Sequence, residues 1–176
     1  MLKWLRWPLV ALGIVLGLFL LATAIGYSMP ASHRATRSAR FSRAPEEVWV
    51  AIADIRGQPS WRREITRAER LPDRNGHEVW RESDASGSGV AFETLESVPP
   101  VRLVRRIVDD SLPFGGTWTM VLTPEGDGTR LAVTEEGVVR NAFFRFLVRV
   151  VIGYGATADA YLRALGTKFG EEVTPR

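Results

Sequence analysis

The chain lacks cysteine entirely and carries only two histidines, His33 and His77, among its 176 residues. Without cysteine there are no disulfide frameworks, zinc fingers, thiolate nucleophiles or cysteine-ligated iron–sulfur clusters. Two histidines are too few for a histidine-rich metal centre, so we expect neither a metal site nor a cofactor. The length suits one domain of ordinary size plus one extra segment.

A strong charge of either sign is also missing. The 23 basic and 20 acidic residues leave a net charge of +3, and removing Lys3 and Arg6 leaves 21 basic residues against 20 acidic ones. The two signs are interleaved along the chain, which gives little support to a nucleic-acid partner. Hydrophobic residues make up 45% of the chain, enough for a packed core and against wholesale disorder.

A long apolar segment opens the chain. No formal charge occurs from Trp7 to Ser32, and Leu9 to Ile25 is almost wholly aliphatic. As a helix rising about 1.5 Å per residue, this segment spans about 30 Å, the thickness of a bilayer's hydrocarbon core. Trp4, Trp7 and Tyr27 stand at its ends, where aromatic rings prefer the headgroups. We therefore predict a single-pass, uncleaved membrane anchor, with residues 1–32 as anchor and short linker.

The alternative for this segment is a cleaved secretory signal. Lys3 and Arg6 resemble a charged n-region, and Ala22-Thr23-Ala24 resembles a cleavage site. The apolar run is longer than the about 7–15 residues of a signal h-region, which favours the anchor. Arginines follow the segment as well as precede it, so the positive-inside rule leaves the side of the domain open.

After the anchor the pattern predicts an α+β domain. A helix is expected from Pro45 to about Asp54, where proline and two glutamates open an apolar repeat of helical spacing, and a small helix around Trp61. Seven short segments with strand character are joined mainly by tight turns, among them the hairpin signal Asn75-Gly76. They are Ala35–Ser42, Ile65–Leu71, His77–Ser83, Val90–Val98, Val101–Asp109, Thr117–Thr123 and Thr129–Val138. We expect one antiparallel meander.

The last predicted element is a long helix from Asn141 to Phe169, closed by Gly170. It would be nearly 45 Å long, at about 1.5 Å per residue. Its apolar stripe follows steps of three and four: Phe143, Phe146, Leu147, Val150, Tyr154, Ala158, Tyr161, Leu162, Leu165 and Phe169. Only the sheet offers enough apolar surface to cover it, so we predict a curved seven-stranded sheet around this helix.

Several local motifs resemble those of the START-like, or SRPBCC, superfamily and its bacterial polyketide cyclase/dehydrase-like branch, a resemblance that implies a bacterial cell membrane for the anchor. They are Phe41–Trp49, Pro59-Ser60-Trp61, Phe92-Glu93-Thr94 with Pro99-Pro100 and Arg102-Leu103-Val104, and Gly116-Thr117-Trp118 with Gly128–Leu131. The resemblance covers residues 33–170 and leaves 171–176 as a tail. It implies a helix-grip fold with a deep apolar cavity that binds lipids, isoprenoids, polyketides or other hydrophobic small molecules. Few members share catalytic residues, so none is assigned.

Eight residues are candidates for contact with such a ligand: Trp61, Trp80, Glu82, Trp118, Met120, Glu135, Phe143 and Tyr154. Strand alternation places Glu135 on the inward face with Leu131 and Val133, but the stronger expectation is that it lies at the rim, hydrated or paired with an arginine. The tryptophans could line a pocket or fill the core. Glu82 and Arg105 could face a cavity, but an exterior cross-strand ion pair is the stronger expectation.

Three further segments invite a functional interpretation. Pro113-Phe114-Gly115-Gly116 lacks the ending of a phosphate-binding loop and is interpreted as a turn, with a mobile lid as its functional hypothesis. His33 beside the membrane and His77 after a turn make a Ser-His-Asp triad implausible. The apolar stretch Phe143–Ile152 either docks on lipid headgroups or packs on loops or a partner.

Three functions remain open. The favoured one is a membrane-tethered binding or carrier module for a hydrophobic small molecule. The others are a cyclase/dehydrase-type enzyme using Glu135 or Glu82, and an interaction module with a collapsed cavity. A chain beginning near His33 is expected to fold alone as a soluble monomer. Tyr154→Phe should weaken binding and spare stability, whereas Phe146→Ala should lower the melting temperature.

Overall fold

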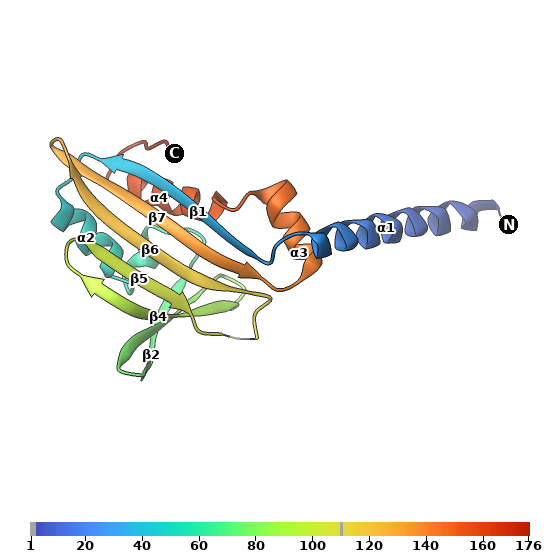
Figure 1. Cartoon of the computed structure of the whole chain (residues 1–176), viewed down its shortest axis with the longest axis horizontal. Helices are drawn as coiled ribbons and strands as arrows, with labels where there is room; N and C mark the ends of the chain where they lie inside the picture. The colour runs from blue at the N-terminus through green and yellow to red at the C-terminus, as the bar shows by residue number, and fades with distance from the viewer. Residues whose placement is uncertain (1–2, 110) are drawn as a thin grey trace.

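The N-terminal apolar segment forms one helix that projects from the domain. The computed structural model describes residues 3–109 and 111–176, with the side chains of the first helix from Trp7 onward. Helix α1 (Lys3–Ser28) extends away from the body of the protein, with the N-terminus at its far end (Figure 1). The stretch Trp7–Ser28 is long and apolar enough to cross a membrane, and its large apolar side chains are exposed.

The domain is built on a seven-stranded antiparallel sheet with the order β1-β7-β6-β5-β4-β3-β2. Its strands are β1 (Ser32–Phe41), β2 (Arg67–Arg74), β3 (His77–Ser83), β4 (Gly89–Val98), β5 (Arg102–Ile107), β6 (Phe114–Glu125) and β7 (Gly128–Val139). Six strands follow one another as a meander, and β7 closes beside β1. The predicted strands and meander are therefore confirmed, with ends displaced by a few residues.

One crossover joins the two edges of the sheet. The chain leaves β1, forms α2 (Pro45–Ala53) and the short 3₁₀ helix η1 (Gln58–Ser60), and enters β2 at the opposite edge. The β2–β3 hairpin turns at Asn75 and Gly76, whose φ angles are 52° and 80°. Both residues thus lie in the left-handed region that a type I′ turn requires, which explains this pair of residue types.

The predicted glycine turn is part of a strand. Phe114, Gly115 and Gly116 open β6 and pair with Val139, Val138 and Gly137 of β7. The interpretation of residues 113–116 as a turn is therefore wrong for most of the segment, and so is the hypothesis of a mobile lid. A Cβ at Gly116 would lie 2.6 Å from the carbonyl oxygen of Glu136. The glycine is needed for close strand packing.

The predicted 29-residue C-terminal helix is also wrong, because the chain breaks near its middle. Asn141 caps α3 (Ala142–Leu147), a π-helical turn η2 (Val148–Ile152) follows, and α4 spans Ala156–Lys168. The break falls at Gly153-Tyr154-Gly155, where Gly153 has a φ of 87°. Glycine is a weak helix former and adopts positive φ at little cost, so two glycines here end the helix.

The two halves of this segment cover different surfaces. Helix α4 lies on the sheet, where Tyr161, Leu162 and Leu165 are buried in the main core. Helix α3 lies instead against the C-terminal end of α1 (Figure 1). Phe146 on α3 is only half-buried and outside the main core, so the large loss of stability expected for Phe146→Ala loses its basis.

The contact between α1 and α3 is close and specific. The rings of Phe19 and Phe143 lie 4.7 Å apart, and Gly26 packs so tightly on Ala142 that a Cβ could not fit. The Arg145 guanidinium donates hydrogen bonds to the carbonyls of Gly26 (3.3 Å) and Met29 (3.1 Å). Gly26 lies in the last turn of α1 and Met29 directly follows the helix, where a continuing helix no longer supplies partners to the backbone carbonyls. The arginine therefore joins α3 to the end of the apolar helix.

The C-terminal residues 171–176 are also held. Arg176 and Ser38 exchange two backbone hydrogen bonds, of 2.9 Å and 3.0 Å, along the outer edge of β1. The Glu171 carboxylate accepts from the backbone N–H of Ser42. The tail thus covers an edge of the sheet that would otherwise expose unpaired backbone groups.

Candidate functional site

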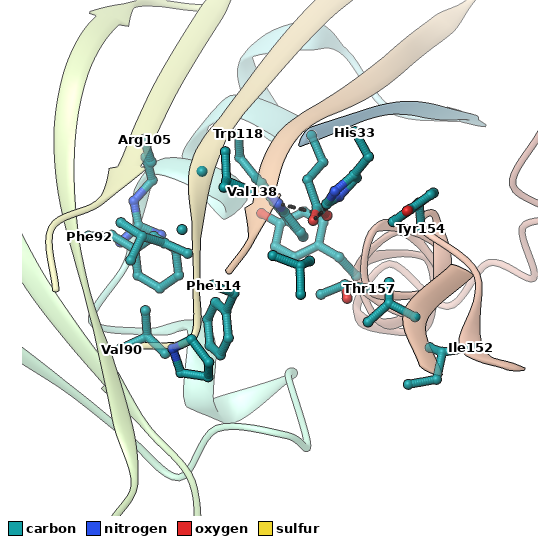
Figure 2. A pocket seen from close by; sticks show the side chains of 18 of the residues that line it. His33, Val90, Phe92, Arg105, Phe114, Trp118, Val138, Ile152, Tyr154 and Thr157 are labelled. Carbon is teal, nitrogen blue, oxygen red and sulfur yellow. Dashed lines mark hydrogen bonds and ion pairs between the residues drawn. The ribbon is translucent and has the colours of Figure 1, made fainter. Parts of the chain in front are cut away.

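A cavity of about 480 Å³ lies between the sheet and the C-terminal helical segment. Residues of β4, β5, β6 and β7 form one wall, and residues of α3, η2 and α4 form the other. Figure 2 shows Phe92 and Arg105 on one side, with Tyr154 and Ile152 across from them. Most of the lining is apolar, which suits a hydrophobic ligand.

The inner end of the cavity contains a buried group of charges. The carboxylate of Glu82 lies 2.7 Å from Arg62 Nη1 and 2.5 Å from Arg105 Nη1. Arg62 also pairs with Glu64 at 2.7 Å and donates to Gln58 Oε1 at 2.8 Å. The expected ion pair between Glu82 and Arg105 exists, but the expectation that it lies on the exterior is wrong, because both side chains are buried and line the cavity.

These neighbours fix the protonation states of the group. Burial alone would raise the pKa of Glu82, but the Arg105 and Arg62 guanidinium groups outweigh it and hold the pKa below its ordinary value. Burial likewise opposes the charge on Arg62, but Glu82 leaves the pKa of Arg62 raised. Glu82 is therefore a carboxylate at neutral pH, and it is shared between two cations.

Tyr161 of α4 stands at the centre of the inner end. Its ring meets the rings of Trp61 and Trp118 edge-on, at 5.5 Å and 5.7 Å, and the Arg62 guanidinium lies 5.2 Å from its centroid. Burial raises the pKa of the Tyr161 phenol, so it stays neutral and able to donate a hydrogen bond. Its hydroxyl has no hydrogen-bond partner among the described residues.

A second polar group lies on the same cavity near β1. Glu135 accepts a hydrogen bond from Trp118 Nε1 at 3.1 Å and lies 3.2 Å from His33 Nε2 (Figure 2). The His33 ring stacks on Tyr154 at a centroid distance of 4.1 Å. A carboxylate paired with an imidazole at an apolar cavity is an arrangement that can accept and return a proton.

The mouth of the cavity is apolar and exposed. Four of its lining side chains are between 40% and 57% exposed: Phe114, Val138, Phe144 and Ile152. Val150 and Val151, in the same π-helical turn as Ile152, are exposed as well. Phe144 belongs to α3, and η2 follows α3 directly. Because α3 contacts α1, the mouth lies next to the end of the apolar helix.

Of the eight candidate residues, five line the cavity: Glu82, Trp118, Met120, Glu135 and Tyr154. The other three do not. The Trp61 ring meets Tyr161 edge-on, and the guanidinium groups of Arg56 and Arg70 each lie 5.9 Å from the centroid of the Trp80 ring. Phe143 packs on Phe19 of α1. Ligand contact by the five stays a prediction.

Among the cavity residues that the sequence analysis did not single out are His33 and Arg62. His33 was interpreted as a membrane-proximal residue, but β1 pairs along β7, and Gly137 opposite His33 leaves room for its ring. Arg62 follows Trp61 in a loop, where no periodicity reveals its direction. No set of three His, Asp or Glu side chains within 3–109 and 111–176 is arranged to hold a metal ion.

The sequence and the fold were compared with those of known proteins. A family model described as polyketide cyclase/dehydrase and lipid transport matches residues 32–169. No curated protein matches the sequence. The Zhui aromatase/cyclase from Streptomyces sp. R1128 superposes with a TM-score of 0.62 at 15% identity, covering 78% of this chain and 93% of the other.

Two other solved structures are similar at comparable level. The di-domain ARO/CYC StfQ from the steffimycin biosynthetic pathway gives a TM-score of 0.63 at 12% identity over 78% of this chain, which spans only 50% of that protein. Truncated norcoclaurine synthase from Thalictrum flavum gives 0.62 at 9% identity, covering 78% of this chain and 93% of the other. At these identities the similarity shows a shared fold alone.

Proposed function

The chain belongs to the polyketide cyclase/dehydrase and lipid transport family, and from this membership we propose that it is a membrane-tethered module that binds a hydrophobic small molecule. The observation that carries the proposal is the cavity of about 480 Å³ with its largely apolar wall. A packed domain interior leaves few voids larger than a water molecule, so an apolar space of this size favours a ligand over plain core packing.

The tether is supported by α1. Its exposed apolar side chains form a surface that water disfavours and a bilayer covers, and its length matches the hydrocarbon core. The full chain should stay in the membrane fraction after alkaline carbonate extraction, with its N-terminus intact. A mature chain that begins near Ile25 would identify the segment as a signal instead.

The position of α3 supports loading of the cavity from the bilayer. Phe19 lies nine residues before the end of α1, about 13 Å along the helix at 1.5 Å per residue, and it contacts Phe143 of α3. With α1 across a membrane, α3 and the exposed residues of η2 lie at the depth of its last turns. The apolar mouth then opens toward lipid, and a hydrophobic ligand enters without crossing water.

Native mass spectrometry of the full chain released from membranes tests occupancy of the cavity. We expect a bound apolar molecule on the unaltered chain and its loss from Ile107→Trp, which fills the cavity. Val101→Trp, an exposed position outside the cavity, is the matched control and should keep the molecule. Equal amounts of bound apolar molecule on the two variants would contradict the proposal.

A second function, proton transfer of the cyclase/dehydrase type, is supported by one observation, the Glu135–His33 pair at the cavity. In a dehydration, Glu135 would take a proton from a ligand carbon, and a neighbouring hydroxyl would leave as water with a returned proton. Incubating the extracted ligand with the chain should then yield a product lighter by one water. Glu135→Gln should abolish that product; an unchanged ligand in both samples favours binding alone.

A further inference from the structure

The inner end of the cavity holds hydrogen-bond donors that the protein itself does not satisfy. Arg105 is 5% exposed, and of its three guanidinium nitrogens only Nη1 is bonded, to Glu82. Nε and Nη2 of Arg105 and the hydroxyl of Tyr161 have no partner among the described residues. All three atoms belong to residues that line the cavity. Buried donors are normally hydrogen-bonded, so these call for an acceptor.

The two unbonded nitrogens of Arg105, Nε and Nη2, lie along the same edge of the planar guanidinium group. Nε–H and one Nη2–H point the same way in the guanidinium plane, and a carboxylate with two oxygens matches this fork. One face of the guanidinium group is covered by the Phe92 ring, whose centroid lies 4.8 Å away. A ligand therefore meets Arg105 in the plane, along its Nε–Nη2 edge.

The local charges favour an anion. Glu82 is divided between Arg62 and Arg105, and Arg62 has a second carboxylate, the half-exposed Glu64. Arg105 has no other ion-pair partner among residues 3–109 and 111–176, so positive charge is in excess at its free edge. The other carboxylate on the cavity, Glu135, is bonded to His33 and Trp118.

We propose that the ligand is an apolar molecule ending in a carboxylate, held by the Nε–Nη2 edge of Arg105 with a further hydrogen bond from the Tyr161 hydroxyl. Its apolar part occupies the cavity toward the mouth. This proposal rests on the proposed binding function and specifies the head group of the molecule bound.

Three probes of equal chain length test it: decanoate, decanol and decylamine. Each is titrated calorimetrically at pH 8 into the full chain in phosphatidylcholine nanodiscs, with empty nanodiscs as the blank. We expect decanoate to bind at least ten-fold more tightly than decanol, and decylamine the least tightly. Arg105→Gln should remove this ten-fold preference and keep the affinity for decanol within about two-fold of that of the unaltered chain. Tyr161→Phe should weaken the binding of decanoate several-fold.

Arg102→Gln is the matched control, since Arg102 lies on the same strand but pairs with Glu96 at the surface; it should leave all three affinities unchanged. The comparison of probes on the unaltered chain needs no variant, so it stands even where Arg105→Gln fails to fold. Equal binding of decanoate and decanol overturns the head group proposal and leaves the binding function intact. Absence of binding by all three overturns both.

Discussion

The two ends of the cavity differ in almost every physical respect. The inner end is closed and polar, with Glu82, Arg105 and Tyr161 each at most 5% exposed. The mouth is open and apolar, with Phe114 and Ile152 exposed by 40% and 57%. Soluble proteins generally arrange these in the opposite way, with apolar groups inside and polar groups outside. Under the proposed function, the inner end would select the ligand and the mouth would face the apolar interior of a membrane.

The same contrast divides the C-terminal helical segment. Helix α4 contributes Tyr161 and Leu162 to the inner end and the core, whereas α3 and η2 contribute Phe144 and Ile152 to the mouth. The break at Gly153 and Gly155 lets one continuous stretch of chain serve both surroundings. Stability should therefore depend on the inner end, and access of the ligand should depend on the mouth.

Glu82→Gln is expected to lower the unfolding free energy more than any other substitution considered. Removing this carboxylate leaves Arg62 and Arg105 buried with far less compensation, and breaking a buried ion pair costs about 3–5 kcal/mol of unfolding free energy. Urea unfolding of the full chain in mild detergent measures this loss of unfolding free energy. Glu135→Gln, a carboxylate nearer the mouth without an arginine partner, is the control and should cost less than about 1 kcal/mol. Equal losses of unfolding free energy in the two variants would show that the two ends of the cavity do not differ in their contribution to stability.

The next largest change in unfolding free energy is expected in α4, and it should distinguish α4 from η2. Leu162→Ala in α4 removes a fully buried side chain and should lower the unfolding free energy by about 2–5 kcal/mol. Val151→Ala in η2 removes an exposed side chain and should change it by less than about 0.5 kcal/mol. A cost for Val151→Ala as large as that for Leu162→Ala would mean that η2 belongs to the core.

The pH dependence of stability sharpens the description of the inner end. Because the folded pKa of Glu82 lies below its ordinary value of 4.5, its ion pairs stabilise the fold fully above that value. This contribution is lost as the pH falls through the lowered, folded pKa. The unfolding free energy should therefore drop less steeply below pH 4.5 in Glu82→Gln than in the unaltered chain. Parallel curves would show that Glu82 is not the carboxylate responsible.

The smallest effect on stability is expected from Tyr154→Phe. The Tyr154 ring keeps its stacking on His33 when only the hydroxyl is removed, so the melting temperature should hardly move. Binding of a ligand near the mouth should weaken about two- to five-fold, the value of one modest hydrogen bond. A marked fall in melting temperature with unchanged affinity would make Tyr154 part of the packing instead.

The strands, the hairpin at Asn75-Gly76 and the helix at Pro45 could be predicted, because alternation, turn residues and capping act over short distances. The break at Gly153 was missed since the apolar repeat of the helix continues through it in sequence. The charged group at the inner end was harder to predict from the sequence, because Glu82 and Arg105 lie 23 residues apart and Arg62 reaches them from a loop. Whether such a pair faces a cavity or solvent depends on sheet curvature, which a strand pattern does not encode.

The connection between α1 and β1 limits how far the domain can travel. Only residues 29–31 separate the two elements, and three residues span at most about 11 Å when fully extended. Arg145 shortens this reach further by bonding to the carbonyls of Gly26 and Met29. If α1 anchors the chain in a bilayer, as proposed above, the domain would diffuse laterally and would not shuttle through the aqueous phase. On this proposal, a ligand would be exchanged only with the lipid beneath the domain or with a protein that itself comes to the membrane surface.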